Sequence, residues 1–146
     1  MGRYVLEDLR VLTYYIRRAL NAGANQLDLT NIQMAILNFV ALRNYEHIDT
    51  CQKEVEDAFN ISKSSMSDSL QSLENKGLIV RSICQDGDSR RKMITLTEKG
   101  MKTNEKSFKF LKEVNEKVLS PLDENEIKSL SDILDKLIKN LGGQKI

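Results

Sequence analysis

Residues 62–100 constrain the fold most, because they begin with a short helical pattern that has one apolar side and one polar side. Met66, Leu70 and Leu73 recur at spacings of four and three, so a helix here would bury that side. The opposite side carries short polar side chains, namely Ser64, Asp68, Gln71 and Asn75. Such a face suits the hydrogen-bonding edges of a DNA major groove, because no bulky apolar side chain keeps it away from the bases.

Two strand patterns and a turn follow this helix directly. Residues 78–83 and 93–96 are rich in branched apolar side chains, and Gly77 is the predicted C-cap of the helix. The Asp-Gly pair at 86–87 favours a hairpin turn, and residues 90–92 would make the hairpin tip basic. A helix followed at once by a hairpin with a basic tip indicates a winged helix-turn-helix.

Several segments resemble those of MarR-type transcriptional regulators. LENKGLI at 73–79, DSRR at 88–91 and LTEKG at 96–100 are similar to the end of that family's recognition helix, its wing tip and its wing exit. LTNIQ at 29–33 and TCQKEV at 50–55 resemble the starts of its second and third helices. The resemblance implies a mainly α fold with a small β-wing, in which a winged helix-turn-helix is flanked by N- and C-terminal dimerisation helices. It also implies a homodimeric repressor that a small molecule releases from a pseudo-palindromic operator in double-stranded DNA.

The predicted DNA-binding residues lie on the recognition helix and on the wing. We expect Arg90 or Arg91 to enter the minor groove, while Asp88 forms an ion pair that orients the loop. Relatives often carry arginine or lysine on the recognition helix where this chain has Asp68 and Ser72, so binding should depend more on backbone amides, serines and the wing. The full predicted set is Ser62, Lys63, Ser64, Ser65, Ser67, Asp68, Gln71, Asp88, Arg90, Arg91 and Lys92.

Helical patterns fill the part of the chain before the recognition helix. A first helix is predicted at residues 3–22, ending before the small and polar residues that follow it. Thr30 is the predicted N-cap of a second helix, with Gln33 completing a capping box. Ile48 is placed in a minimal third strand beside the wing, and Thr50 is the predicted N-cap of the third helix.

Two long helices are predicted after the wing, at residues 97–119 and 123–141, with a proline between them. The first and last helices of the chain carry narrow apolar seams, made by Val5, Leu9, Leu12, Ile16 and Leu20 and by Ile127, Leu130, Leu134, Leu137 and Leu141. Narrow seams of this kind suit packing between long helices. We therefore expect one compact chain in which residues 1–25 and 101–146 form a helical dimerisation region and residues 26–100, the winged region, bind DNA.

Composition narrows the chemistry that the chain can carry out. The net charge is only +1, so the signal for nucleic acid lies in the distribution of charge, and basic residues outnumber acidic ones between Ser62 and Lys102. There is one histidine, and no HExxH, phosphate-loop, GxSxG or dinucleotide motif, so the sequence predicts no catalytic residue, no metal site and no cofactor. A small enzyme and a winged-helix module for protein partners remain alternatives, and salt-dependent DNA binding would separate them from a regulator.

Two routes for a regulatory signal follow from the sequence. Tyr14, Tyr15 and Arg17 are candidates for a pocket next to the second helix, because an aromatic and cationic wall suits the small aromatic or anionic effectors that many relatives bind; packing at a dimer seam is the other interpretation. Cys51, in the first turn of a predicted helix, and Cys84 leave a thiol-based, redox-responsive regulator as an alternative. Two separated cysteines, no signal peptide and no bilayer-spanning apolar run predict a cytoplasmic protein without a membrane anchor.

Overall fold

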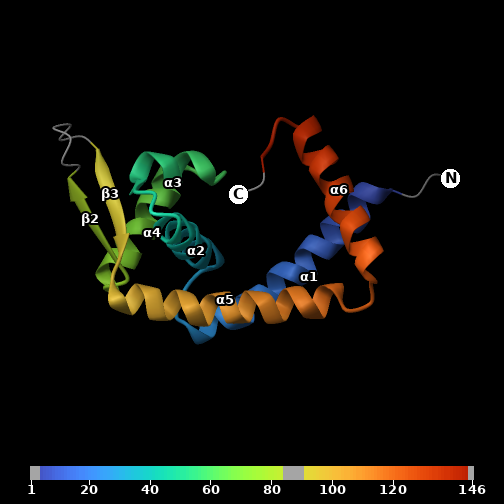
Figure 1. Ribbon diagram of the computed structural model, residues 1–146, viewed down its shortest axis with the longest axis horizontal. Coiled ribbons are helices and arrows are strands. Elements are labelled where there is room, and N and C mark those ends of the chain that lie inside the picture. Colours follow the sequence, from blue (N-terminus) through green and yellow to red (C-terminus); the bar gives the residue numbers. More distant parts are fainter. Residues whose placement is uncertain (1–3, 84–90, 145–146) are drawn as a thin grey trace.

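The computed structural model describes residues 4–83 and 91–144, which form helices and one small sheet (Figure 1). The elements in chain order are α1 (Val5–Gln26), α2 (Asn31–Tyr45), β1 (Thr50–Cys51), α3 (Gln52–Ala58), α4 (Lys63–Asn75), β2 (Ile79–Ile83), β3 (Lys92–Leu96), α5 (Glu98–Leu119) and α6 (Glu124–Asn140). The predicted fold, a winged helix-turn-helix flanked by terminal helices, is confirmed.

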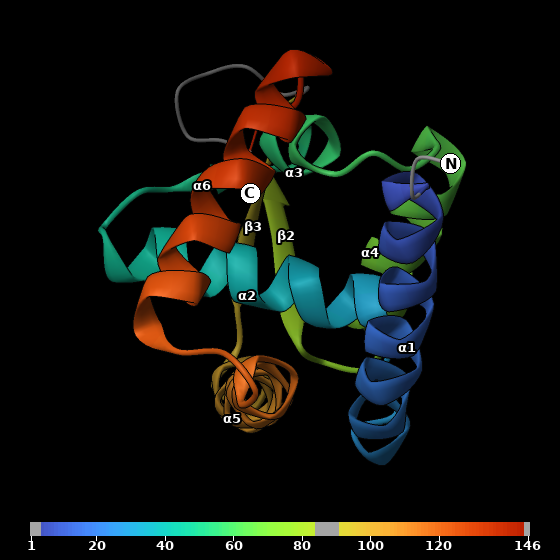
Figure 2. The ribbon, with the colours of Figure 1, turned by 90° about the vertical axis from the view of Figure 1, so that its right-hand side faces the viewer.

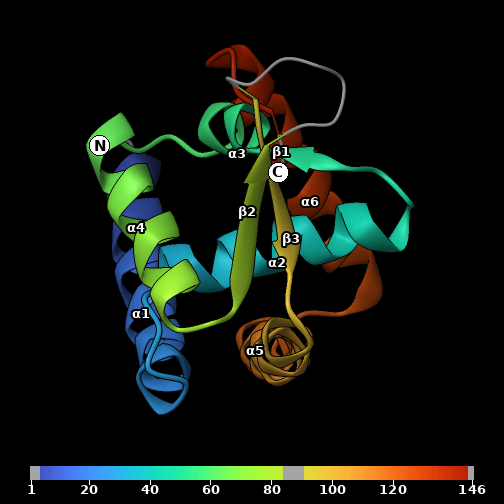
Figure 3. The same ribbon diagram turned by 90° about the vertical axis from the view of Figure 1, so that its left-hand side faces the viewer.

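The three strands make an antiparallel sheet in the order β1-β3-β2 (Figure 3). The long pair runs from Ile79 opposite Leu96 to Ile83 opposite Lys92. On the other side of β3, Thr50 of β1 lies opposite Ile94. The wing strands are thus tied to the segment that leads into α3.

The hydrophobic core lies where α2 packs between α4, α5 and the sheet. Four apolar residues of α2 are fully buried or nearly so, namely Met34, Ile36, Leu37 and Val40. The second helix is therefore central to the core. Its start is as predicted, because Thr30 Oγ1 accepts from the Gln33 amide at 3.2 Å and Gln33 Oε1 accepts from the Thr30 amide at 3.0 Å.

The prediction that the first helix ends at residue 22 is wrong. The helix continues to Gln26, since Gly23 and Ala24 are buried and the ring of Phe110 on α5 packs directly against Gly23. A Cβ atom at position 23 would lie 2.1 Å from that ring, so only glycine allows α1 and α5 to approach this closely. The chain turns instead at Asp28, whose φ is 54°.

The third strand and the start of the third helix also differ from prediction. The strand is made by Thr50 and Cys51, not by Ile48. Thr50 is not the N-cap of α3; it is buried in the sheet, and its Oγ1 accepts from Arg43 Nε at 3.1 Å. Cys51 takes the N-cap position, and its amide donates to Glu54 Oε2 at 2.8 Å.

Helix α5 is a straight rod that begins at the wing exit and reaches the far end of the molecule, where α6 starts (Figure 1). Asp123 caps α6 in a box with Glu126, at the position where the sequence predicts the helix to start. Viewed along α5, α1 lies to the right of the rod and α6 above it (Figure 2), and none of the described α6 residues is buried. Within the described parts of the chain, no helix is long and apolar enough to cross a lipid bilayer.

Candidate nucleic-acid interface

Helix α4 is the predicted recognition helix, and its two faces are as expected from the sequence. Met66, Leu70 and Leu73 are buried in the core. Ser62 is the N-cap, since its Oγ accepts from the Ser65 amide at 3.1 Å. Gly77, with a φ of 72°, takes the left-handed conformation that ends the helix.

The predicted DNA-binding residues that the structure describes are all exposed. The α4 members of the set are all exposed, namely Ser62, Lys63, Ser64, Ser65, Ser67, Asp68 and Gln71. Arg91 and Lys92 are exposed where β3 begins. Asp88 and Arg90 lie outside the described residues, so the predicted ion pair and minor-groove contact of the wing tip stay predictions.

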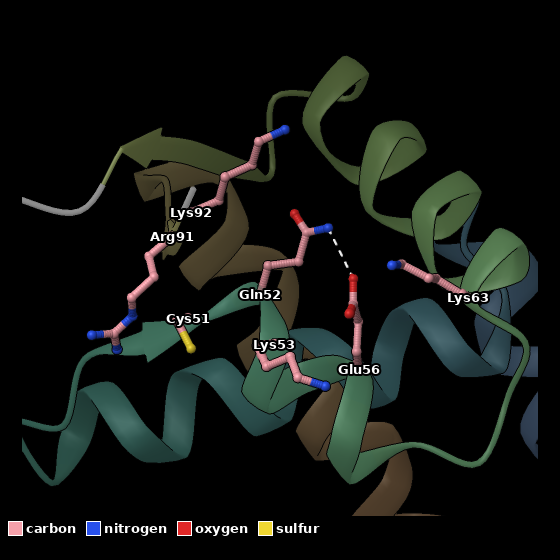
Figure 4. A pocket seen from close by; sticks show the side chains of 7 residues that line it. All are labelled: Cys51, Gln52, Lys53, Glu56, Lys63, Arg91 and Lys92. Atoms are coloured by element: carbon pink, nitrogen blue, oxygen red, sulfur yellow. Dashed lines mark hydrogen bonds between the residues drawn. The ribbon is translucent and has the colours of Figure 1, made fainter. Parts of the chain in front are cut away.

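A cleft of about 530 Å³ lies between α3, the start of α4 and the start of β3 (Figure 4). It brings Lys63 together with Arg91 and Lys92, which are distant in sequence. The rest of its lining comes from Cys51, Gln52, Lys53 and Glu56. Four cationic side chains and one carboxylate therefore surround the cleft, which gives it a positive potential next to the recognition helix.

Sequence analysis missed Gln52 and Lys53 as candidate site residues. Gln52 Nε2 donates to Glu56 Oε1 at 3.1 Å (Figure 4), while its Oε1 is buried without a hydrogen-bond partner among the described residues. Lys53 Nζ lies 3.0 Å from Asp57 Oδ1, and both side chains are exposed. The segment at 50–55, which resembles the start of the family's third helix, was the available sequence signal for these two residues. Its position beside the wing depends on the pairing of β1 with β3.

A partly buried polar network holds α3 in place beside the wing. The Arg43 guanidinium donates to Asp49 O at 2.9 Å and to Glu54 Oε1 at 2.7 Å, in addition to its bond with Thr50. Its centre lies 5.6 Å from the centroid of the Phe39 ring. The Cys51 amide and the Arg43 guanidinium lower the pKa of Glu54, so this carboxylate stays charged and fixes the start of α3.

Arg81 of β2 joins the wing to the recognition helix. Its guanidinium donates to Glu74 Oε2 through Nη2 at 2.7 Å and Nε at 3.1 Å, and to Gln71 Oε1 through Nη2 at 2.8 Å. Gln71 Nε2 in turn donates to Asn75 Oδ1 at 2.9 Å. The hydrogen bond from Arg81 lowers the pKa of Glu74. The exposed face of α4 is therefore ordered by a contact from the wing.

The end of the recognition helix is also tied to the start of α5. Thr97 Oγ1 donates to Gly77 O at 2.6 Å, and Lys99 Nζ donates to Lys76 O at 2.8 Å. A Cβ atom on Gly100 would lie 2.0 Å from Leu78 O, so the backbones meet at van der Waals distance there. These contacts connect the angle of the α5 rod to the position of α4.

A second, more apolar cavity of about 500 Å³ lies between α1, α2 and α5. Its lining residues are Ile16, Leu20, Asn38, Phe108, Leu111, Lys112, Val114, Asn115 and Val118. The predicted ligand-binding residues lie outside this lining. Tyr14 and Tyr15 are exposed on α1, with their rings in an edge-to-face contact at 5.3 Å, and Arg17 is also exposed.

Among residues 4–83 and 91–144, no cluster of His, Cys, Asp and Glu has the makeup of a metal site. A polar recognition helix, a two-stranded wing and a cationic cleft between them define a winged helix-turn-helix DNA-binding protein.

Comparisons with known proteins identify the family. Residues 27–92 match the model of the MarR family. The chain is 33% identical over 115 residues to the HTH-type transcriptional regulator BilQ of Clostridium symbiosum. This alignment covers 79% of this chain and 78% of BilQ. The chain therefore belongs to the MarR family of transcriptional regulators.

Solved structures agree with this assignment. The S. aureus MepR–DNA complex is similar with a TM-score of 0.83 and 26% identity, over 97% of this chain and 99% of the MepR chain. The apo form of E. coli MarR has the same fold, with a TM-score of 0.75 and 18% identity over 94% of this chain and 99% of MarR.

Proposed function

We propose that the protein is a homodimeric repressor that binds a pseudo-palindromic operator and is released by a small ligand. The observation that carries the proposal is the cleft in Figure 4, which Lys63 lines on one side and Arg91 and Lys92 line on the other, beside the start of α4. DNA phosphates would lie along this cationic cleft while α4 enters the major groove. The similarity to MepR in complex with DNA supports this placement. Because its partner is promoter DNA, we expect the protein to act in the cytoplasm.

Exposed apolar side chains on the terminal helices support the homodimer. Leu6 on α1 is 81% exposed, and Leu141 at the end of α6 is 86% exposed. Further exposed apolar residues are Val5, Val11 and Leu12 on α1 and Ile133 and Leu137 on α6. A second copy would cover such surfaces, so we assign residues 1–25 and 101–146 to dimerisation and residues 26–100 to DNA binding.

The cavity between α1, α2 and α5 is our candidate for the ligand site. Its walls are largely apolar, with Lys112 as the cation and Asn38 and Asn115 as amides, so a small aromatic acid fits their chemistry. Tyr14, Tyr15 and Arg17, which lie outside this lining, remain candidates from the sequence. A ligand that favours a different angle of α5 would change the separation of the two recognition helices from the repeat of one DNA turn, about 34 Å.

Selection of bound fragments from genomic DNA, followed by affinity measurements at several salt concentrations, tests the proposal. The parent protein should bind selected sites with a linear fall of log affinity against log salt. Lys63→Ala should weaken binding to all sequences and reduce the slope by about one. Lys106→Ala, which removes an exposed cation of α5 outside the cleft lining, serves as the matched control. Absence of selective DNA binding by the parent would refute the proposed function.

A further inference from the structure

Arg81 makes a contact that bears on which base the recognition helix can read. Its side chain is only 13% exposed and lies between β2 and α4. It binds Glu74 with two hydrogen bonds and Gln71 with one. The contact to Glu74 is an ion pair between β2 and α4. The contact to Gln71 involves an exposed residue on the side of α4 that we expect to face DNA.

The contact fixes the orientation of the Gln71 amide. A guanidinium has N–H donors and no acceptor, so the group that faces Arg81 at 2.8 Å must be the carbonyl oxygen of Gln71. The amide nitrogen then points the other way and donates to Asn75 Oδ1 at 2.9 Å. This bond also orients the Asn75 amide, because the Asn75 oxygen must face the Gln71 donor and its NH₂ group then points away from Gln71.

The chain of bonds therefore runs in one direction, from Arg81 through Gln71 to Asn75. The N–H groups left for a partner are one on Gln71 and the NH₂ of Asn75, which are donors. Each amide oxygen keeps a second lone pair, but the bond that the oxygen already accepts turns it toward its donor inside the network. A glutamine that reads adenine must offer its oxygen and its nitrogen together to N6 and N7. Guanine instead presents two acceptors, N7 and O6, in the major groove.

We propose that Arg81 is a positioning residue that commits the Gln71 oxygen and so directs the recognition helix to a guanine rather than an adenine. The proposal rests on the proposed function, since it assumes that α4 enters the major groove of an operator. It adds a buried wing residue to the determinants of specificity. The wing then has two roles, contact with DNA at its tip and orientation of α4 at its base.

The test measures dissociation constants for the selected operator with each base pair substituted in turn. The parent should prefer guanine over adenine by about tenfold at one position of each half-site. Replacing that guanine by 7-deazaguanine, which lacks the N7 acceptor, should reduce the preference. Gln71→Ala should abolish the preference at this position and leave the others unchanged.

Arg81→Gln should remove the same preference, because the Gln71 amide is then free to rotate. The double variant with Gln71→Ala should have the base profile of Gln71→Ala alone. Glu74→Gln is the matched control, since it weakens the pair with Arg81 but keeps the bond to Gln71: thermal stability should fall while the guanine preference persists. If circular dichroism shows that Arg81→Gln is unfolded, Arg81→Lys replaces it, because lysine keeps the charge beside Glu74 without the guanidinium that reaches both partners.

Three results would overturn the inference. One is an unchanged guanine preference in the folded Arg81 variant. Another is an equal loss in Glu74→Gln, and the third is a changed profile when Arg81 is replaced in the Gln71→Ala background. Each of these leaves specific DNA binding intact, so it is distinguishable from failure of the proposed function, in which the parent selects no DNA.

Discussion

The winged region and the terminal helices use apolar residues in opposite ways. In the winged region, Leu37, Leu70 and Leu73 have no exposed surface, and the core closes within one chain. In α1 and α6 the same periodic spacing of apolar residues leaves large side chains in contact with solvent, among them Val5, Leu12 and Leu141. Regular spacing therefore identifies a buried face without saying which chain buries it.

The largest effect is expected in the core of the winged region. Leu70→Ala removes a fully buried side chain of α4 and should cost about 2–5 kcal/mol of unfolding free energy, through lost burial and the cavity left behind. Urea denaturation measures this value. Leu42→Ala on α2, where the side chain is 55% exposed, is the control and should change stability by less than about 0.5 kcal/mol. Equal effects of the two variants would contradict the described core.

Charges placed on α6 should separate the two regions. Ile133→Lys with Leu137→Lys puts two cations on an apolar surface that we assign to the dimer interface. Because the two winged regions would then no longer be held together, operator affinity should fall roughly 100-fold or more. Circular dichroism should still report a folded winged region. Leu42→Lys, an equally polar change in the winged region, should leave assembly intact. A double variant that remains dimeric would remove α6 from the interface.

A ligand at the boundary between the two regions should have a smaller effect. Salicylate-like acids should weaken operator binding roughly 5- to 150-fold if they bind the cavity between α1, α2 and α5 and favour another rod angle. Leu111→Trp, which fills that cavity, should abolish the response and keep DNA binding.

Thiol sensing is the competing route to the same response. Cys51 is a free, buried cysteine that lines the cationic cleft, while Cys84 lies outside the described residues. Loss of DNA binding under peroxide alone, absent in a variant with both cysteines replaced by serine, would favour the redox model over the ligand model.

Replacing the wing arginines tests whether the winged region contacts DNA through its wing. Replacing Arg90 and Arg91 together by alanine should weaken binding to every sequence and reduce the salt slope by about two, one unit for each lost phosphate contact. Fluorescence anisotropy over a range of salt concentrations gives both quantities. An unaltered affinity and slope would show that the wing does not contact DNA.

The smallest effect is expected from acid titration of the winged region. The pKa of Glu54 is lowered from its ordinary value of 4.5 by the Cys51 amide and Arg43. Its stabilising contribution is therefore complete above that value and is lost as the pH falls through the lower, folded pKa. The difference in thermal midpoint between the parent and Glu54→Gln should shrink below about pH 4.5. A difference that persists at pH 3 would show that the charge of Glu54 is not its source.

Local patterns were enough to predict the recognition helix and several helix ends. The buried and exposed faces of α4 follow from a period of 3.6 residues, and the caps at Thr30 and Asp123 follow from neighbouring residues. Contacts between distant residues decided the rest. The Phe110 ring packs against Gly23, so α1 continues past the residue where its sequence pattern ends. Arg43 binds the Thr50 hydroxyl that would otherwise cap α3.

The candidate site could be predicted only in part for the same reason. Lys63 and the wing cations were recognisable from motifs, but Gln52 and Lys53 enter the cleft through strand pairing of β1 with β3. The bond from Arg81 to Gln71 depends on how β2 packs against α4, which no periodic pattern encodes. Asp88 and Arg90 lie outside the described residues, so their roles at the wing tip stay predictions.

Sedimentation equilibrium of the parent protein, alone and with a selected operator, tests the central claim most directly. We expect a dimer at micromolar concentration that dissociates on sufficient dilution, and two chains on each full operator. A half-operator should bind much more weakly, because only one recognition helix can engage it. A monomer at micromolar concentration that is unchanged by dilution and binds the full operator as a single chain would contradict the account.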